Sequence, residues 1–357
     1  MTPQFHVLRV AEIRPETPDA ISLRFDVPAH LRAAYVFVQG QHLTLKASID
    51  GVDVRRSYSI CAGPQDDELR VAIKRVRGGV FSGFAHGGIK VGDDLSVMTP
   101  DGHFHVALDP LQARNYVAFV AGSGITPVLS IIRATLRQEP RSRFTLVYGN
   151  RQQADMMFHE ALEDLKDRYL TRFRLYHLFS REATDVGLFN GRIDGGRTRA
   201  LLDALIPPDT IDHAFVCGPG AMIDEVEAAL IDAGVPRDRI HAERFGVAGA
   251  QVAAPVSAQA GDAPRATITV VLDGVRRDID FHDIDGSILD AALRAGLDLP
   301  FSCKGGMCCT CRARKLAGEV RMDRNFSLDA RDLAAGFVLT CQSHPLTDRV
   351  TVSFDDR

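Results

Sequence analysis

The sequence predicts a multidomain fold: an antiparallel β-barrel, then a doubly wound α/β domain, then a small α+β domain of the β-grasp type. Three observations support this prediction. Segments up to about residue 108 are short and strand-like, a β-α-β-α order begins near residue 114, and a stretch rich in Ala, Gln, Gly, Pro and Ser lies at 247–265. We therefore expect domains at 1–110, 111–246 and 266–357, with 247–265 as a flexible linker.

The composition is that of an ordinary globular protein. The chain has 357 residues, 45% of them hydrophobic and 25% charged, and this length suggests two or three domains. Its net charge of −4 argues against nucleic-acid binding. No apolar run approaches the length of a membrane span. Because seven cysteines occur without a charged-then-apolar leader, we expect a reducing, cytoplasmic location.

The first domain is predicted from six short strand-like segments, with Asp50-Gly51 as a hairpin turn between two of them. Six short strands without long helices are typical of an antiparallel barrel. The segments are 6–13, 20–27, 41–49, 52–61, 68–76 and 94–98.

The second domain alternates strands and helices. Its first strand, 116–121, is entirely apolar, which is typical of a parallel sheet covered on both faces. Further strands are expected at 144–149, 174–179, 213–218 and 240–243, with helices up to about residue 137 and at 154–168, 198–205 and 221–233.

Two glycine-containing loops follow strands of this domain, where the ligands of doubly wound sheets bind. The loops read Gly122-Ser123-Gly124-Ile125-Thr126-Pro127 and Cys217-Gly218-Pro219-Gly220-Ala221-Met222. Glycines let a backbone approach a pyrophosphate, and the helix N-terminus behind them favours its negative charge. Either loop alone is as well explained by a simple tight turn. Together they predict one dinucleotide crevice.

The third domain is predicted to contain strands at 266–272 and 275–281 around a turn at Asp273-Gly274. A helix capped by Ser287 is expected at 288–295, a second short helix at 328–335 and a strand at 337–340. This order of elements favours a small sheet with a helix across it.

Four cysteines of the third domain, Cys303, Cys308, Cys311 and Cys341, stand in a C-x4-C-x2-C…C order. This is the plant-type spacing for a [2Fe–2S] cluster, and Cys309 is expected to point away from the metal. A structural zinc site and unligated cysteines are the alternatives, although zinc usually takes two similar cysteine pairs. The spacing favours an electron-transfer protein.

The strand segment Arg56-Ser57-Tyr58-Ser59, followed by the two glycine loops, resembles the ferredoxin–NADP reductase superfamily. The resemblance implies an FAD cofactor, with Tyr58 over its ring, Arg56 at its phosphate and Ser59 near its N5 edge. Residues two apart share one face of a strand, so Arg56 and Tyr58 can touch the same ligand. A surface Arg and a sheet-packing Tyr are the alternative interpretation.

The same resemblance implies roles for further positions. It puts Cys217 beside the nicotinamide, and Glu243 and Phe245 where an acid and an aromatic ring close the active site. A hydrophobic plug at the end of a domain is the alternative for Phe245. The segment implied to bind the flavin phosphate comprises Lys74, Gly79, Val80, Phe81 and Ser82.

NADPH is the expected electron donor. Ser180 and Arg181 follow a strand end, where a cation can meet the 2′-phosphate of the adenosine ribose. The neighbouring Glu182 argues in the opposite direction, because NAD sites tend to offer an acid at this position.

The order of barrel, nucleotide domain, linker and ferredoxin domain resembles the reductases of multicomponent bacterial oxygenases. More narrowly, the segments at 16–20, 188–194, 303–311 and 338–345 resemble the reductases of the phenylacetyl-CoA epoxidase family. The resemblance implies a di-iron oxygenase as electron acceptor and no nucleic-acid or membrane partner. The alternatives are the reductase of another aromatic-ring oxygenase, a stand-alone flavin or ferric reductase, and an iron–sulfur redox sensor.

Positive charge surrounds the cysteine loop in the sequence, at Lys304, Arg312, Arg314 and Lys315. We therefore expect a basic rim that steers this domain to an acidic patch on its acceptor. An ordinary solvated loop is the alternative.

Overall fold

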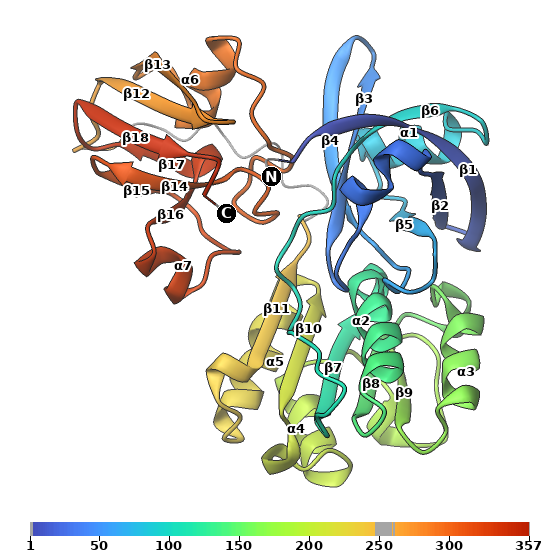
Figure 1. Ribbon diagram of the computed structural model, residues 1–357. Helices are drawn as coiled ribbons and strands as arrows, with labels where there is room; N and C mark the ends of the chain where they lie inside the picture. The colour runs from blue at the N-terminus through green and yellow to red at the C-terminus, as the bar shows by residue number, and fades with distance from the viewer. Residues whose placement is uncertain (1–2, 247–258, 260, 357) are drawn as a thin grey trace. The chain divides into compact units, whose positions relative to one another are not determined.

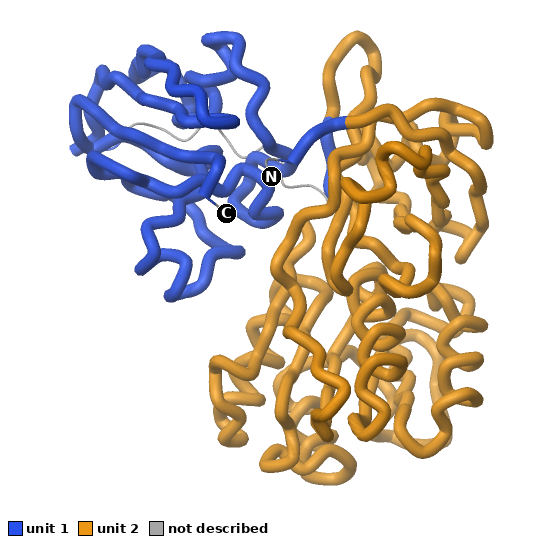
Figure 2. The backbone as a smooth tube through the Cα atoms, viewed as in Figure 1, with its two compact units in different colours: residues 1–5, 55–57, 248–357 blue, residues 6–54, 58–247 orange. Residues whose placement is uncertain are grey.

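The computed structural model describes residues 3–246, 259 and 261–356 (Figure 1). Most of the expected linker, 247–258 and 260, lies outside the described residues. The chain forms two compact units, one of residues 6–54 and 58–247 and the other of residues 1–5, 55–57 and 248–357 (Figure 2). Apart from Arg55–Ser57 and the residues up to Phe5, the barrel belongs to the first unit together with the α/β domain, and the C-terminal domain belongs to the second. The expected domain boundaries stay predictions.

The barrel is an antiparallel sheet of six strands in the order β4-β3-β6-β1-β2-β5. Alternate side chains enter its core; in β2, Leu23 and Phe25 are buried while Arg24 between them is partly exposed. The predicted antiparallel barrel is confirmed. The strands are β1 (Phe5–Thr17), β2 (Ala20–Asp26), β3 (His42–Ile49), β4 (Val52–Ser59), β5 (Leu69–Lys74) and β6 (Asp94–Met98).

Two helical segments of the barrel were not expected from its strand-like pattern. They are the 3-10 segment η1 (Ala29–Tyr35) and the helix α1 (Val80–Gly87). The eight residues of α1 include two glycines, which have low helix propensity. The helix forms because Phe81 and Ala85 bury themselves in the barrel core. Tertiary packing here overrides local propensity.

The α/β domain has a five-stranded parallel sheet in the order β11-β10-β7-β8-β9. Tyr116, Ala118 and Val120 of β7 face the core shared with α2 and α3, while Val117 and Phe119 face the core shared with α4 and α5. A strand buried on both faces must be apolar throughout, and the predicted doubly wound fold is confirmed.

The strands and helices of this domain fall close to the predicted ranges (Figure 1). They are β7 (Asn115–Ala121), α2 (Ile125–Gln138), β8 (Arg143–Asn150), α3 (His159–Arg168), β9 (Phe173–Phe179), α4 (Gly195–Ala204), β10 (His213–Gly218), α5 (Gly220–Asp232) and β11 (Ile240–Arg244).

Helix α3 begins later than the predicted range of 154–168. Residues Gln153–Asp155 form a 3-10 turn, and Phe158 has a left-handed backbone conformation with φ of 59°. A helix cannot pass through a left-handed residue. The segment between these points buries Met156 and Met157 instead, and α3 starts at His159.

The C-terminal domain has a five-stranded mixed sheet in the order β13-β12-β18-β14-β16. The hairpin β12 (Arg265–Leu272) and β13 (Val275–His282) turns at Asp273 and Gly274, both with positive φ, as a two-residue type I′ turn requires. Helix α6 (Ile288–Arg294) packs Ile288 and Leu289 into the core. The Ser287 side chain accepts a hydrogen bond from the Asp290 backbone N–H. The β-grasp arrangement and this cap are confirmed.

Four strands of this domain have no counterpart in the prediction: β14 (Arg312–Ala317), β15 (Val320–Met322), β17 (Ser343–Pro345) and β18 (Arg349–Ser353). β14 carries three charges in six residues and pairs with β18 and β16 (Phe337–Leu339). Helix α7 (Ala330–Ala334) starts two residues later than predicted, because the Asp329 side chain caps it. Cys341 lies in the 3-10 turn η7 (Thr340–Gln342) directly after β16.

Within the described part of the chain, no helix is both long and apolar enough to cross a membrane. The longest of these helices, α2, has 14 residues.

Candidate cofactor and nucleotide site

The two glycine loops meet at the carboxyl ends of β7 and β10, which are neighbours in the parallel sheet. A Cβ atom at Gly124 would lie 2.2 Å from the carbonyl oxygen of Cys217 and 3.1 Å from the amide nitrogen of Gly218. Only glycine fits at this position. The structure therefore brings together two loops that lie far apart in the sequence.

The first loop is held in shape by side-chain hydrogen bonds to its backbone carbonyl groups. Gly122 has a positive φ of 54°, and its carbonyl oxygen accepts a hydrogen bond of 3.2 Å from the Tyr148 hydroxyl. The Thr126 hydroxyl donates to the carbonyl oxygen of Ser123 over 2.9 Å. The loop runs directly into α2, whose first turn includes Pro127 and leaves backbone N–H groups without helical partners. Such a terminus suits a pyrophosphate.

Three predicted site residues of the barrel and the α/β domain also come together. The Ser59 hydroxyl donates to Oε2 of Glu243 over 3.3 Å, and Glu243 lies opposite Cys217 in the parallel pairing of β10 with β11. Withdrawal from water raises the pKa of Glu243 to about 8, although the Ser59 hydrogen bond acts in the other direction. At neutral pH this carboxyl holds a proton.

Burial, and then the nearby Glu243 charge, raise the pKa of the Cys217 thiol well above its usual value. Cys217 is therefore a neutral thiol at neutral pH and a poor nucleophile. This agrees with the expectation that it positions a ligand. Phe245, two residues after Glu243, is partly buried and packs against the core that contains α2.

The four predicted metal-binding cysteines lie in two pairs. The thiols of Cys303 and Cys308 interact with each other, and those of Cys311 and Cys341 do the same. The backbone N–H groups of Gly305 and Cys308 point at Sγ of Cys303, at 3.3 and 3.4 Å. The Cys308 thiol first, and these backbone groups after it, lower the pKa of Cys303.

This donor set fits a two-iron cluster, in which each iron takes two thiolates and the sulfurs accept backbone hydrogen bonds. The structural zinc site, which usually takes two similar cysteine pairs, stays the alternative interpretation of these cysteines. Left-handed backbone at Lys304, Gly306 and Cys309 curls the loop. The Cys309 side chain is buried in the apolar core of the domain.

Comparison with known protein families matches all three parts of the chain. Residues 7–106 match the oxidoreductase FAD-binding domain, 119–228 the oxidoreductase NAD-binding domain, and 270–346 the 2Fe-2S iron-sulfur cluster binding domain. One of the subunits of 1,2-phenylacetyl-CoA epoxidase from Escherichia coli (strain K12) is 49% identical over 351 residues, which is 98% of either chain. The chain belongs to the ferredoxin–NADP reductase superfamily.

Within this superfamily, the relatives are reductase components of oxygenases. The ferredoxin reductase component of 3-ketosteroid-9-alpha-monooxygenase from Rhodococcus rhodochrous is 36% identical over 355 residues, covering 98% of this chain and 96% of its own. The chain is thus an NAD(P)H-dependent oxidoreductase with FAD-binding and 2Fe-2S domains that passes electrons to an oxygenase component.

Solved structures share the fold. Phthalate dioxygenase reductase superposes with a TM-score of 0.58 at 23% identity, covering 98% of both chains. An intact type IV self-sufficient cytochrome P450 monooxygenase superposes with a TM-score of 0.69 at 23% identity, covering 98% of this chain and 41% of that one. At this identity the likeness concerns the fold alone.

The residues expected to bind the flavin make contacts within the protein. Tyr58 lies against Phe81, with ring centroids 5.7 Å apart. Arg56 is exposed, and its guanidinium donates to the carbonyl oxygen of Arg55 over 2.7 Å. Nζ of Lys74 pairs with Asp19 over 3.4 Å.

The segment Gly79 to Ser82 forms the start of α1. Ser82 Oγ accepts a hydrogen bond from the Val76 N–H over 3.1 Å and donates to the Gly79 carbonyl over 3.3 Å. Phe81 is buried in the barrel core. The side chains of Phe81 and Ser82 thus shape the loop, and the groups that remain for an anion are backbone N–H groups at the start of α1.

Ser180 and Arg181 follow the end of β9, which pairs with β8. Backbone N–H groups of Ser180 and Arg181 bond to the carbonyl oxygens of Asn150 and Arg151. A hollow of about 580 Å³ opens here. It is lined by Gln152, Gln153, Ala154, His159 and Glu182, of which only Glu182 was weighed from the sequence. Polar side chains that follow a strand end were the available signal for Gln152 and Gln153; Ala154 and His159 carried no such signal.

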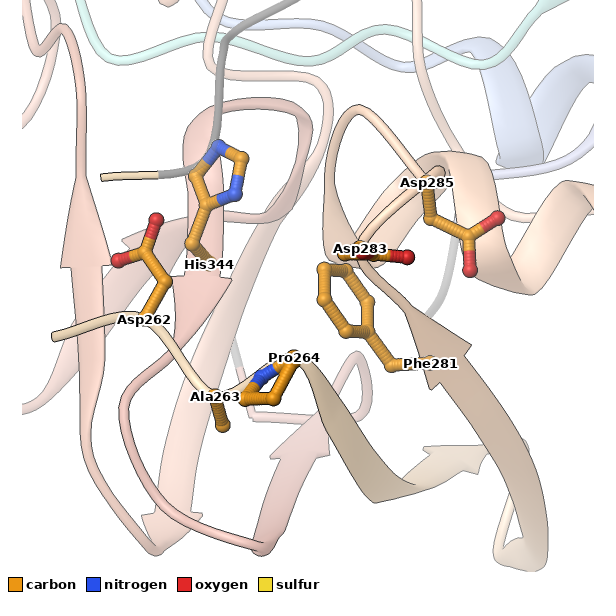
Figure 3. A pocket seen from close by; sticks show the side chains of 7 residues that line it. All are labelled: Asp262, Ala263, Pro264, Phe281, Asp283, Asp285 and His344. Carbon is orange, nitrogen blue, oxygen red and sulfur yellow. The ribbon is translucent and has the colours of Figure 1, made fainter. Parts of the chain in front are cut away.

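One further cavity, of about 140 Å³, lies inside the C-terminal domain between Phe281 and His344 (Figure 3). Two of the three carboxylates that line it form ion pairs: Asp262 with Arg321 and Asp285 with Arg294, each over 2.6 Å. These ion pairs link residues that line the cavity to other segments of the domain.

Proposed function

We propose that the chain is the reductase of a phenylacetyl-CoA epoxidase and delivers electrons from NADPH to a di-iron oxygenase that epoxidises the ring of an aromatic CoA thioester during phenylacetate breakdown. The observation that carries this proposal is the 49% identity to a component of that epoxidase, which extends over 98% of both chains. When bound, the flavin would supply a two-electron hydride acceptor for the nicotinamide nucleotide, and the iron–sulfur cluster would supply a one-electron relay.

The chain's own residues bind and orient these groups. Gly122, Gly124 and Gly218 let the backbone approach the nucleotide pyrophosphate, with Ser123, Thr126, Pro127, Pro219 and Met222 forming the rest of the crevice. This role is supported by the direct contact between Gly124 and Cys217. Flavin binding is assigned to Arg56, Ser57, Tyr58, Ser59, Lys74, Gly79, Val80, Phe81 and Ser82.

Ser59, Cys217, Glu243 and Phe245 are proposed to form the reaction site. The hydrogen bond between Ser59 and Glu243, together with the raised pKa of Glu243, supports a protonated carboxyl held at this point. Cys217, as a neutral buried thiol, contributes shape to the nicotinamide pocket without attacking a substrate.

Cys303, Cys308, Cys311 and Cys341 are proposed as the cluster ligands. Their pairwise arrangement and the backbone N–H groups aimed at Cys303 support this assignment. No disulfide joins any of the seven cysteines, all of which lie among the described residues, in keeping with the proposed reducing, cytoplasmic location.

Ser180 and Arg181 are proposed to bind the 2′-phosphate of NADPH. Oε2 of Glu182 accepts a 2.8 Å hydrogen bond from the Gln153 backbone N–H, so this carboxylate already has a partner. Arg181 makes no ion pair with any residue that the structure describes. Its guanidinium is therefore available to a phosphate.

The test is reconstitution with two acceptors. The purified chain is loaded with flavin, iron and sulfide, and an anaerobic NADPH titration is followed by visible absorption to monitor both redox groups. The loaded chain is then combined with the oxygenase component of a phenylacetyl-CoA epoxidase or, in a parallel assay, with that of a 3-ketosteroid oxygenase. We expect NADPH-dependent product from phenylacetyl-CoA only. Turnover with the steroid component alone would contradict the assignment.

A further inference from the structure

The expected basic rim around the cysteine loop is largely neutralised by partners within its own domain. Lys304 pairs with Asp290 over 2.8 Å, Lys315 with Glu319 over 2.7 Å and Arg312 with Asp332 over 2.5 Å. Arg314 has a more distant partner, Asp356, at 4.0 Å. Ion-paired cations attract a distant acceptor only weakly, so these side chains are poor steering groups.

A different segment lies directly against the cysteine loop. The Phe326 backbone N–H donates to the carbonyl oxygen of Gly306 over 3.0 Å, and the Ser327 hydroxyl donates to the same oxygen over 3.4 Å. A Cβ atom at Gly306 would lie 2.9 Å from the carbonyl oxygen of Arg324. Residues 324–334, which we call the docking segment, therefore begin in contact with the loop that carries three of the cysteines.

The docking segment exposes two large apolar side chains. Phe326 is 44% exposed and Leu333, in α7, is also 44% exposed. The segment itself is well anchored, because Leu328 is buried and the Asp329 and Asp332 side chains each accept backbone hydrogen bonds in the capping box of α7. The exposure is thus a property of a fixed surface. Aromatic side chains and Arg are the residue types enriched in protein interfaces.

The docking segment carries two arginines and two aspartates, and both aspartates are engaged, in the capping box of α7 or with Arg312. Arg324 and Arg331 are exposed, and neither forms an ion pair with any residue in the described ranges 3–246, 259 and 261–356. These arginines differ in this respect from Lys304, Arg312 and Lys315. An acceptor with carboxylates around an apolar depression would complement both features.

We propose that residues 324–334 are the surface on which the oxygenase component docks, with Phe326 and Leu333 buried in the complex and Arg324 and Arg331 facing acceptor carboxylates. The proposal rests on the proposed function, because it takes the oxygenase as the occupant. Contact between the docking segment and Gly306 gives the reason for this position: electron transfer weakens steeply with distance, so the acceptor must approach the surface nearest the cluster.

The test compares two charge reversals in the same domain of the loaded, full-length protein. The first is Arg324→Glu with Arg331→Glu. The control is Arg276→Glu with Arg277→Glu, which lie exposed on β13 at the opposite edge of the sheet from β16 and α7. Both pairs change the net charge equally, so they separate local docking from general electrostatic attraction.

We expect the first pair of substitutions to raise the KM for the oxygenase component roughly tenfold and to flatten its dependence on ionic strength. The control pair is expected to change this KM less than about twofold. NADPH-dependent reduction of ferricyanide and the visible spectrum of the cluster remain unchanged in both, which reports intact folding. Equal effects of the two pairs, or a wild-type KM and salt dependence in the first, would overturn the proposal.

The apolar part is tested with Phe326→Ser and Leu333→Ser against Val275→Ser, another large apolar side chain, 53% exposed at the hairpin turn. We expect the first two substitutions to raise the KM for the oxygenase and Val275→Ser to leave it unchanged. Failure of the proposed function has a different signature: the wild-type chain then drives no phenylacetyl-CoA epoxidation, and docking is measured with the oxygenase that it does serve.

Discussion

The proposed cluster site of the C-terminal domain draws three of its four thiolate ligands from one short loop, residues 303–311. The site between the barrel and the α/β domain is instead assembled from distant residues, namely Ser59, Gly124, Cys217 and Glu243. In the loop, short-range backbone hydrogen bonds orient the groups. In the assembled site, neighbouring strands and one close backbone contact do so. A locally encoded site should fail when one ligand is lost, while an assembled site should fail when the packing between its parts changes.

The largest expected effect is on the cysteine loop. Cys308→Ser should abolish the cluster's visible absorption and electron delivery to the oxygenase, because one iron loses a thiolate. NADPH-dependent ferricyanide reduction should continue. Cys309→Ser is the matched control, and it should retain the cluster since the plant-type spacing leaves Cys309 out of the four ligands. Cluster absorption that survives in Cys308→Ser, or is lost equally in both variants, would show that the four-cysteine assignment is wrong.

Gly124→Ala tests the assembled site. The added Cβ would lie 2.2 Å from the carbonyl oxygen of Cys217 and must separate the two loops. We expect a loss of roughly tenfold to a hundredfold in kcat/KM for NADPH, measured with ferricyanide as acceptor. The control is Gly83→Ala in α1, where an added Cβ meets nothing within 4 Å. Unchanged kcat/KM in Gly124→Ala would contradict nucleotide binding at this contact.

A smaller effect is expected at the proposed 2′-phosphate site. Arg181→Ala should lower the preference for NADPH over NADH by about tenfold, because one charge-assisted contact to the 2′-phosphate is lost. The ratio of kcat/KM for the two nucleotides measures it. Arg168→Ala, at the exposed end of α3, is the control. The assignment of NADPH binding to Arg181 fails if the ratio stays the same in both variants.

The smallest effect concerns stability. Glu243 has a pKa raised to about 8 by burial, so the folded state binds its proton more tightly than the unfolded state does. Its contribution to stability is complete at low pH, declines as pH rises above the ordinary value near 4.5, and is lost once pH exceeds about 8.

Glu243→Gln should remove this decline. Between pH 6 and pH 9, the Tm of the wild type should fall by roughly 3 °C more than that of the variant, as followed by thermal unfolding. Glu160→Gln, at an exposed position of α3, should behave as the wild type. Parallel pH profiles for the wild type and Glu243→Gln would show that Glu243 ionises normally.

Fold class was predictable because each domain has its own periodicity. The alternation in β2 and the unbroken apolar run of β7 identify strands with one buried face and with two. Prediction failed where tertiary contacts decide the backbone. Phe158 adopts a left-handed conformation that delays α3, and charged β14 becomes a strand because β16 and β18 flank it.

The candidate site residues also divide into those that the sequence predicted and those that only the structure revealed. The glycine loops and the cysteine spacing could be recognised from residue types alone, and so could Arg56, Tyr58 and Glu243 through a family resemblance. Gln152, Gln153 and His159, which line the hollow beside Glu182, carry no distinctive motif. The charges of Lys304 and Arg312 were read correctly, but their carboxylate partners Asp290 and Asp332 come from segments whose proximity depends on the fold. Glu319, the partner of Lys315, lies only four residues further along the chain.

The amino-acid sequence by itself determined which backbone positions are free to curl around a cluster or approach a phosphate, because glycine and cysteine spacing acts over a few residues. Only the tertiary structure decided that Ser59 hydrogen-bonds to Glu243, that Gly124 touches Cys217, and that Arg324 and Arg331 remain without ion-pair partners among the described residues. The physical reason is range: local conformation depends on neighbouring residues, whereas burial and charge pairing depend on which distant segments pack together.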